Sequence, residues 1–120
     1  MTTYRIAVIA GDGIGQEVMP EGMRALEAAG AVAGLSFEWT QFDWSCEVYA
    51  NTGRMMPEDG LEQLKAFDAI YLGAVGWPGV PDHISLWGLL IPIRRAMGQY
   101  ANLRPVRLFE GVPCPLANRT

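Results

Sequence analysis

The chain has 120 residues, which fit one ordinary domain or part of one, and half of the residues are apolar. Charged residues make up 18%, with 14 glycines and 8 prolines, a globular composition that excludes disorder, collagen and low complexity. The longest uncharged stretch, residues 69–81, is too short and too rich in glycine and proline to span a membrane. Because no basic region precedes the first strand pattern, we expect no signal peptide and a soluble, cytoplasmic protein.

Charge is divided unevenly along the chain. Residues 1–93 have a net charge of −8, whereas residues 94–120 have a net charge of +4. An acidic body repels a polyanion, so this pattern excludes the footprint of a nucleic-acid-binding protein. The basic segment at residues 94–120 instead suits the binding of a small anion. Its five arginines are Arg94, Arg95, Arg104, Arg107 and Arg119.

Few residues are available for metal binding or nucleophilic catalysis. Cys46 and Cys114 form no CxxC pair, and with a single histidine they supply neither a zinc site nor a disulfide framework. We expect both thiols to be buried or idle. His83 follows Asp82 in a loop and is interpreted as a local hydrogen-bonding residue. The chain therefore holds no complete catalytic constellation and no set of metal ligands.

The N-terminal third predicts a strand, a turn and a helix. The apolar run at residues 4–10 predicts a buried strand, and the glycine-rich residues 11–15 predict a tight turn. A helix over residues 16–29 follows, with Gly30 at its exit and Pro20 in or near its first turn. Its predicted core positions are Met19, Met23, Leu26 and Ala29.

The middle of the chain continues this alternation. The pattern of residues 35–42 predicts a second strand, and a second helix is expected with Pro57 at its first position. Residues 67–73 predict a third strand. Strands separated by helices are typical of an α/β fold with a parallel sheet.

The last third is less regular. Residues 86–100 predict a third helix with Ser85 as its N-cap, and Pro92 must delay its start or kink it. Residues 103–109 predict a last strand, which Pro105 confines to an edge or a bulge. Because no element is predicted after residue 109, we expect the chain to be part of a longer one.

Two segments are expected at the edge of the sheet where a ligand would bind. Ligands of open α/β sheets bind at the carboxyl ends of the strands, where the turn at residues 11–15 and the loop at residues 74–84 lie. The turn is similar to the dinucleotide fingerprint G-x-G-x-x-G, but Gln16 stands where the third glycine belongs. Glu38 would suit the ribose of a dinucleotide. Three interpretations stay open: a standard dinucleotide site, a plain turn between strand and helix, and another ligand-facing use.

Arg94 and Arg104 carry the sharpest hypothesis. If Arg94 lies on the third helix and Arg104 on the strand that returns beneath it, both guanidinium groups can grip the carboxylates of one ligand. Arg95 points about 100° away from Arg94 on a helix and is expected to be solvated. Solvated surface charge is the alternative for all three arginines. Trp77 and Trp87 flank the loop and are interpreted as structural anchors.

Three sequence blocks have a distinctive order and spacing: GDGIGQE at residues 11–17, LGAVG at residues 72–76 and ANLRP at residues 101–105. Together they resemble the N-terminal part of the β-decarboxylating dehydrogenases, the isopropylmalate and isocitrate dehydrogenase family. The run at residues 73–88, followed by RR at 94–95 and QY at 99–100, resembles the tartrate and D-malate dehydrogenase branch. The resemblance covers essentially the whole chain.

The resemblance implies an isopropylmalate dehydrogenase-like three-layer α/β sandwich, a parallel or mixed sheet with flanking helices. Residues 1–120 would form its N-terminal, incomplete portion. The resemblance also implies NAD-dependent oxidation and decarboxylation of a small 2-hydroxy diacid, with Mn²⁺ or Mg²⁺ polarising the forming ketone. It further implies a homodimer when the chain is complete.

The same resemblance implies roles for particular residues. Arg94 and Arg104 correspond to the arginines that grip the substrate carboxylates, and Trp87 meets the variable group of the substrate. The catalytic residues and the metal ligands correspond to positions beyond Thr120, so the fragment is expected to be inactive alone. The residues that line the cofactor correspond to Ile14, Gly73, Ala74, Val75 and Gly76.

Three positions before Arg94 separate the branches of the family. Isocitrate-specific members carry serine and asparagine where this chain has Gly88 and Leu90. Isopropylmalate-specific members commonly carry a glutamate where this chain has Trp87, and the bulky indole favours an unbranched C4 diacid. The alternative within the family is a 3-isopropylmalate dehydrogenase fragment. The alternative outside it is a non-catalytic α/β anion-binding module.

Overall fold

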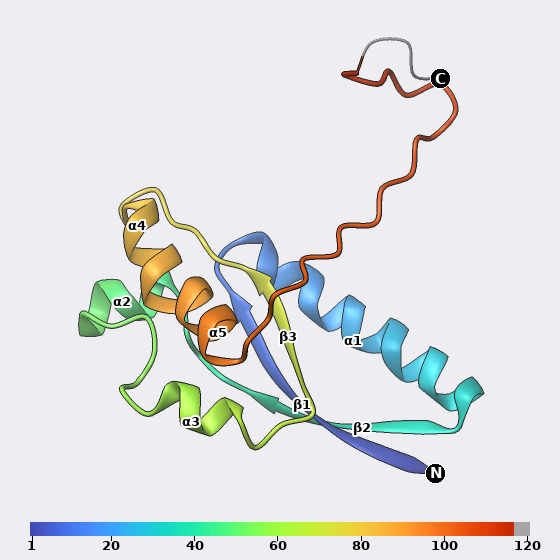
Figure 1. The fold of residues 1–120 in the computed structure, drawn as a ribbon, viewed down its shortest axis with the longest axis horizontal. Coiled ribbons are helices and arrows are strands. Elements are labelled where there is room, and N and C mark those ends of the chain that lie inside the picture. The colour runs from blue at the N-terminus through green and yellow to red at the C-terminus, as the bar shows by residue number, and fades with distance from the viewer. Residues whose placement is uncertain (117–120) are drawn as a thin grey trace.

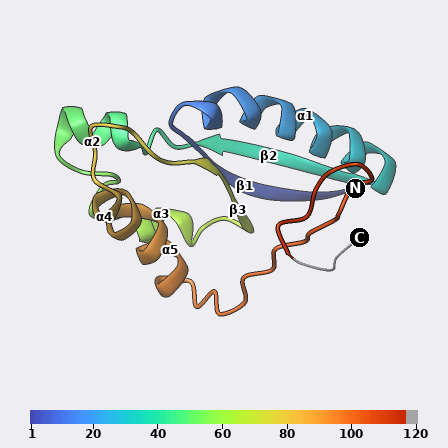
Figure 2. The same cartoon turned by 90° about the horizontal axis from the view of Figure 1, so that it is seen from above.

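The computed structural model describes residues 1–116, and residues 117–120, with Arg119 among them, lie outside the described part. Its centre is a three-stranded parallel sheet in the order β2-β1-β3. Helices flank both faces of this sheet (Figures 1 and 2), so the expected α/β class is confirmed. The strands are β1 (Thr2–Gly11), β2 (Leu35–Gln41) and β3 (Ala69–Ala74).

The elements form three layers. Figure 2 shows α1 (Ile14–Ala33) on one face of the sheet, with α3 (Gly60–Leu64) and α5 (Ile91–Ala96) on the other. Most residues of α1 on the side away from the sheet are exposed. This arrangement is the flanked sheet that the sequence predicts.

The central strand β1 supplies both cores, because successive side chains of a strand point to opposite faces. Ile6 and Val8 pack with Met19 of α1 in one cluster. Ala7 and Ile9 belong to the other cluster, on the side of α3 and α5. Burial on both faces explains why the sequence of β1 is an unbroken apolar run rather than an alternating one.

The first helix is longer than expected. It ends with Gly34 in the left-handed conformation at φ 73°, and the Gly34 N–H donates to the carbonyl of Gly30. Gly30 is therefore not the exit that the sequence predicts. It lies inside α1 and is buried, and a Cβ there would lie 2.8 Å from the ring of Phe37 on β2. The glycine permits close helix–strand approach.

Two further expectations for α1 are wrong in detail. Because α1 begins at Ile14, Pro20 lies beyond its first turn. Met19 is buried and Met23 is half-buried, but Leu26 and Ala29 are exposed, so only the first half of the predicted stripe packs on the sheet. Although α1 has 20 residues, no helix among residues 1–116 is both long and apolar enough to cross a membrane.

A short helix, α2 (Cys46–Thr52), occupies a region in which the sequence pattern predicted no element. Ser45 is its N-cap, whose side chain accepts a backbone N–H at 3.2 Å, and Gly53 ends the helix at φ 80°. The helix expected from Pro57 begins at Gly60 instead. The Gly60 N–H donates to the Pro57 carbonyl at 2.9 Å, so a turn precedes the helix.

The third predicted helix consists of α4 (Asp82–Ser85), a π-helical turn η1 (Leu86–Leu90), and α5. The run begins at Asp82, so Ser85 is not its N-cap. The Ser85 hydroxyl lies inside the run and donates to the Asp82 carbonyl at 3.1 Å. The run ends at Ala96, four residues before the predicted end, and Gly98 follows at φ 62°.

Pro92 adjoins the π-helical turn and supplies a physical reason for it. Proline has no N–H, so the carbonyl of Gly88 has no hydrogen-bond partner four residues later. The N–H of Ile91 reaches back five residues to the Leu86 carbonyl, which is the hydrogen bond of a π-helix. The irregularity expected from Pro92 is thus a widened turn.

The strand predicted at residues 103–109 is absent. Those residues are irregular and exposed, and the chain runs away from the body of the molecule there (Figure 1). A strand exists only where a neighbour completes its hydrogen bonds. Among the described residues no strand pairs with this segment. Apolar alternation alone therefore overpredicted regular structure here.

Candidate functional site

The carboxyl ends of β1 and β3 meet at one edge of the sheet. Gly11 pairs with Ala74 in the parallel register, and the N–H of Asp12 donates to the Ala74 carbonyl at 2.7 Å. This edge holds the two segments that the sequence places at a ligand. They are the turn that leads into α1 and the loop that leaves β3.

Gly15 allows the two segments to approach closely. A Cβ at Gly15 would overlap the carbonyl oxygen of Ala10 and would lie 2.7 Å from the backbone nitrogen of Ala74. In the dinucleotide fingerprint the third glycine performs this packing role. Here the packing glycine stands one position earlier, and Gln16 turns its side-chain amide back to the Gly11 carbonyl at 2.7 Å. The turn therefore differs from the standard dinucleotide turn in geometry as well as in sequence.

The residues predicted to line a cofactor lie around this edge. Ile14 opens α1, and 59% of its surface is exposed. Gly73, Ala74 and Val75 are half-buried. Gly76 is exposed, and no atom lies within 4 Å of where its Cβ would be. An exposed apolar side chain next to open backbone fits the flat surface of a cofactor ring.

Asp12 is the polar centre of the site, and the sequence reasoning missed it. Only 5% of Asp12 is exposed. Its Oδ2 accepts hydrogen bonds from the N–H groups of Cys46 at 2.9 Å and Gly76 at 3.3 Å, and its Oδ1 accepts from Glu47 at 3.2 Å. An aspartate between two glycines after a buried strand is the signal that was available, because such residues bond neighbouring backbone N–H groups.

The Asp12 carboxylate also affects the pKa of the neighbouring Cys46 thiol. Burial of the thiol, the negative charge of Asp12, a hydrogen bond to Asp12 and the charge of Asp82 together raise the pKa of Cys46 from 9.0 to about 11. The thiol is therefore protonated and a poor nucleophile at neutral pH. Both cysteines are free, and Cys46 is buried as expected while Cys114 is half-buried.

Arg94 lies on α5 beside the edge strand of the sheet. It lines a cavity of about 150 Å³ with Leu90 and Ile93 from the helical run, Gln99 just after it, and Ile70 and Leu72 from β3. The guanidinium is exposed, and none of the ion pairs formed within residues 1–116 involves it. Arg94 is thus a cation next to the sheet with no acidic partner in the described part of the chain.

Arg104 is not on a strand beneath the third helix, because residues 103–109 are irregular. It is exposed and makes no ion pair with a described residue. The structure therefore does not bring Arg104 together with Arg94. Their convergence on one ligand stays a prediction.

Trp87 lies in the π-helical turn and is 56% exposed. It lines an open groove of about 510 Å³ whose other residues include Tyr49, Arg54 and His83. The guanidinium carbon of Arg95 lies 5.1 Å from the centre of a Trp87 ring, a cation–π distance. Arg95 is exposed as expected, but it is not simply solvated. Trp87 and Arg94 line different cavities.

The remaining candidates have minor roles. His83 is exposed, and its imidazole makes no hydrogen bond to another described residue, so the expected local hydrogen bond is not formed. Trp77 pairs with Val80 in an isolated antiparallel bridge, which closes the loop after β3. Within residues 1–116, no three metal-ligating side chains of His, Cys, Asp or Glu gather at one place.

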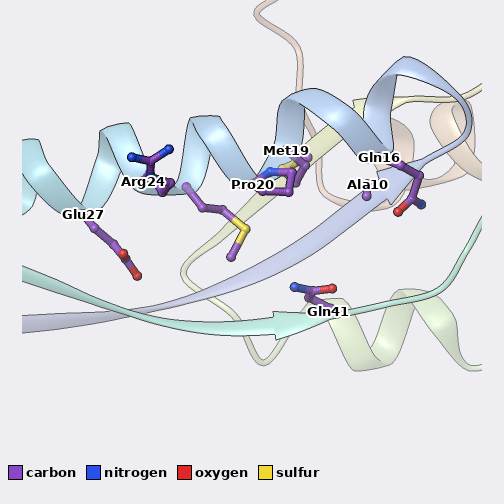
Figure 3. Close-up of a pocket in the computed structure, with 8 residues that line it drawn as sticks. Ala10, Gln16, Met19, Pro20, Arg24, Glu27 and Gln41 are labelled. Atoms are coloured by element: carbon purple, nitrogen blue, oxygen red, sulfur yellow. The ribbon is translucent and has the colours of Figure 1, made fainter.

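A further cavity of about 260 Å³ lies between α1 and β2 (Figure 3). Met19, Pro20 and Met23 give it an apolar wall, and Arg24 and Glu27 stand at the end farther along α1. None of the residues predicted to bind cofactor or substrate lines it. Ala10 and Gln16 also line it, so the cavity adjoins the turn after β1 on the side of β2.

Comparison with known proteins finds strong relatives. The family described as isocitrate/isopropylmalate dehydrogenase matches residues 5–120. A D-malate dehydrogenase (decarboxylating) of Escherichia coli is 62% identical over 99% of this chain and 34% of its own length. A tartrate dehydrogenase/decarboxylase of Pseudomonas putida is 62% identical over 98% of this chain and 33% of its own length. The chain thus spans about a third of the length of these curated relatives.

A solved structure is similar as well. The crystal structure of a β-decarboxylating dehydrogenase from Thermococcus kodakarensis, in its apo form, superposes with a TM-score of 0.59. It is 33% identical in sequence, and the match covers 81% of this chain and 27% of that one. The similarity of structure agrees with the similarity of sequence.

Proposed function

Because the chain belongs to the isocitrate/isopropylmalate dehydrogenase family, we propose that it is part of an enzyme that oxidises and decarboxylates a small 2-hydroxy diacid, D-malate or tartrate. The observation that carries this proposal is the 62% identity to both a D-malate and a tartrate dehydrogenase. Trp87, Gly88 and Leu90 support the same branch, since they replace the residues typical of isopropylmalate and isocitrate enzymes.

The proposed cofactor is NAD, which accepts a hydride from the carbon that bears the substrate hydroxyl. Ile14 and Gly76 fit such a group because they leave an apolar side chain and open backbone at the same edge. In this proposal Ile14 supplies a surface for a ring, and residues 73–76 exclude water along one side of it. The close backbone approach at Gly15 brings these two segments together at that edge.

The proposed anchor for the substrate is Arg94. A guanidinium binds a carboxylate through two parallel hydrogen bonds, worth roughly 1.5–3 kcal/mol each for charged groups. Arg94 is exposed beside β3, an edge strand of the sheet. It has no acidic partner among the described residues, so its hydrogen-bond donors are available to a ligand. Arg104 is proposed as the second anchor, in a segment that is irregular in this structure.

Mn²⁺ or Mg²⁺ is part of the proposal for the whole enzyme but not for these residues. The described part of the chain contains no cluster of metal ligands, so no step of the reaction is assigned to a metal here. The acid, the base and the metal ligands are proposed to lie outside the described residues. What this chain contributes is binding and orientation.

The test is a hybrid enzyme in which residues 1–120 replace the matching segment of Escherichia coli D-malate dehydrogenase. We expect the hybrid to reduce NAD with D-malate or tartrate in preference to 3-isopropylmalate. Arg94→Lys keeps the charge but loses the two-pronged geometry, so kcat/KM for the diacid should fall well over tenfold, with little change in the KM for NAD. Arg104→Lys should act likewise.

Arg24→Lys is the matched control, because Arg24 is exposed on α1 and pairs with Glu21 at 2.7 Å, a contact that lysine can retain. Its kcat/KM should stay within twofold of the parent. A hybrid that prefers 3-isopropylmalate would favour the alternative within the family. A hybrid in which both Arg94→Lys and Arg104→Lys leave kcat/KM within twofold would return these arginines to solvated surface charges.

A further inference from the structure

We propose that Asp12 is a positioning residue that holds the cofactor-lining loop, residues 73–76, in place through a side-chain hydrogen bond to the N–H of Gly76. This inference rests on the proposed function, since it assumes that the loop borders NAD. Asp12 is only 5% exposed, and its Oδ2 accepts from the Gly76 N–H at 3.3 Å.

The carboxylate joins three segments that are far apart in sequence. Asp12 lies in the turn after β1, Cys46 and Glu47 open α2, and Gly76 follows β3. A carboxylate is acceptor-only when ionised, and two oxygens with four lone-pair sites accommodate three N–H donors. No neutral side chain of similar size offers the same set of acceptors. The site is therefore built for a carboxylate.

Asp12 holds the loop at two points. Its backbone N–H donates to the Ala74 carbonyl at 2.7 Å, and its Oδ2 accepts from the Gly76 N–H at 3.3 Å. One residue thus fixes both the last residue of β3 and the residue two positions beyond it. A substitution of the side chain removes only the second of these bonds, so its effect reports on the loop rather than on the pairing of β1 with β3.

Asp12→Asn is the informative change because it preserves volume. The asparagine amide keeps one oxygen acceptor and replaces the other oxygen with an NH₂ group, a donor that faces other donors. Because Oδ2 serves both Cys46 and Gly76, the asparagine either loses both of these bonds or keeps them on a neutral amide oxygen without the strength that the carboxylate charge gives them. In either orientation the side-chain bond that holds Gly76 is weakened or lost.

The competing explanation is that Asp12 merely stabilises the start of α2. Ser45→Ala separates the two roles, because the Ser45 side chain caps α2 through a hydrogen bond from Val48 and forms no hydrogen bond with residues 73–76. Loss of an N-cap costs about 0.5–2 kcal/mol of stability. If Asp12 acted only through α2, the two variants would have the same catalytic phenotype.

In the hybrid enzyme we expect Asp12→Asn to raise the KM for NAD at least fivefold and to leave the KM for D-malate within twofold. Ser45→Ala should lower the melting temperature while both KM values stay within twofold of the parent. An unchanged KM for NAD in Asp12→Asn would overturn the proposal, as would an equal rise in Ser45→Ala.

A second measurement needs neither a variant nor activity. Hydrogen exchange followed by mass spectrometry on the unmutated hybrid reports on the peptide that contains Gly76. We expect its N–H to be protected although the residue is exposed, because Asp12 accepts its hydrogen. Exchange at the rate of an unbonded amide would refute the proposal. If the hybrid folds but does not reduce NAD, the proposed function fails while this measurement still decides the role of Asp12.

Discussion

At the scale of single residues, the pairing of Asp12 with Cys46 has a chemical consequence. Burial of the thiol, followed by the charge of Asp12, raises the pKa of Cys46 from 9.0 to about 11 in the folded chain. We expect iodoacetamide at pH 8 to label Cys114 in the native hybrid and to leave Cys46 unlabelled until the protein is unfolded. Peptide mass spectrometry measures both sites, and rapid native labelling of Cys46 would contradict the buried, protonated thiol.

The sign of the accompanying pH dependence follows from the direction of the shift. The folded state holds the Cys46 proton more tightly than the unfolded state, so this group favours folding less as pH rises from about 9 to about 11. Cys46→Ser, whose hydroxyl does not titrate in this range, should remove that part of the decline. Thermal melts at pH 8 and pH 10 measure the difference.

Trp87 tests whether the variable end of the substrate reaches the π-helical turn. If the indole narrows that end of the pocket, Trp87→Ala should raise the ratio of kcat/KM for 3-isopropylmalate to that for D-malate at least tenfold in the hybrid. Trp77→Ala is the matched control, since Trp77 is similarly exposed but belongs to the loop after β3. An unchanged ratio would mean that Trp87 only supports Arg95.

At the scale of elements, the junction of β1, α1 and β3 depends on a single missing side chain. Gly15→Ala would force a Cβ into the backbone of Ala10 and Ala74, which cannot shift without parting the strand from the helix. We expect a loss of about 3 kcal/mol or more in the free energy of unfolding, at the upper end of the range for overpacking.

Gly53→Ala is the matched change for Gly15→Ala. Gly53 has open space around its Cβ position and only the strain of φ 80°, which costs roughly 1–2 kcal/mol. Urea unfolding of both variants of the hybrid compares the two effects. Equal losses of unfolding free energy would show that the close backbone approach at Gly15 costs no more than the strained φ at Gly53.

The elements also show what the sequence can and cannot predict. Local apolar patterns predict all three strands of the sheet, an unbroken run for β1 and alternation for β2, because burial of a strand face requires apolar residues at regular positions. The signals of α2, Ser45 and Gly53, were present but lay outside any apolar period, so the helix was missed. Gly30 predicts a helix end but lies within α1 against Phe37, because close packing and helix termination both favour glycine.

Long-range pairing explains the remaining errors. Residues 103–109 have the composition of a strand, but pairing depends on a neighbour that the local sequence does not specify. Asp12 was passed over for the same reason, since its donors lie 34 and 64 positions away in the chain. The positions of Ile14 and residues 73–76 at one edge were predictable, because parallel strands bring their carboxyl ends together.

At the scale of the whole molecule, the chain is less compact than an ordinary folded domain of the same length. Its radius of gyration is 16.8 Å, against about 13.6 Å expected for a compact domain of this length. Its accessible surface is 8669 Å², against roughly 6,400 Å² expected for this mass. Several large apolar residues of the C-terminal segment are exposed, among them Leu103, Val106, Phe109 and Leu116.

We therefore expect residues 1–120, expressed by themselves, to aggregate or to melt without a cooperative transition, because exposed apolar patches promote association. The same polypeptide should not reduce NAD with D-malate or tartrate. Size-exclusion chromatography and scanning calorimetry measure the first outcome. A monomer with one sharp transition would show that these residues close a core unaided, and turnover that survives repurification would contradict the assignment of the catalytic residues elsewhere.

The π-helical turn changes which side chains share a face of the helical run at residues 82–96. Seven residues make nearly two turns of a regular α-helix, so Trp87 and Arg94 would share a face there. The wider turn inserts one residue, and Arg95, eight positions from Trp87, lies against the indole instead. Deleting one codon within residues 88–90 would bring Arg95 to seven positions from Trp87, so a regular α-helix would keep Arg95 against the indole. The wide turn thus lets this helix gain or lose one residue without changing which arginine faces Trp87.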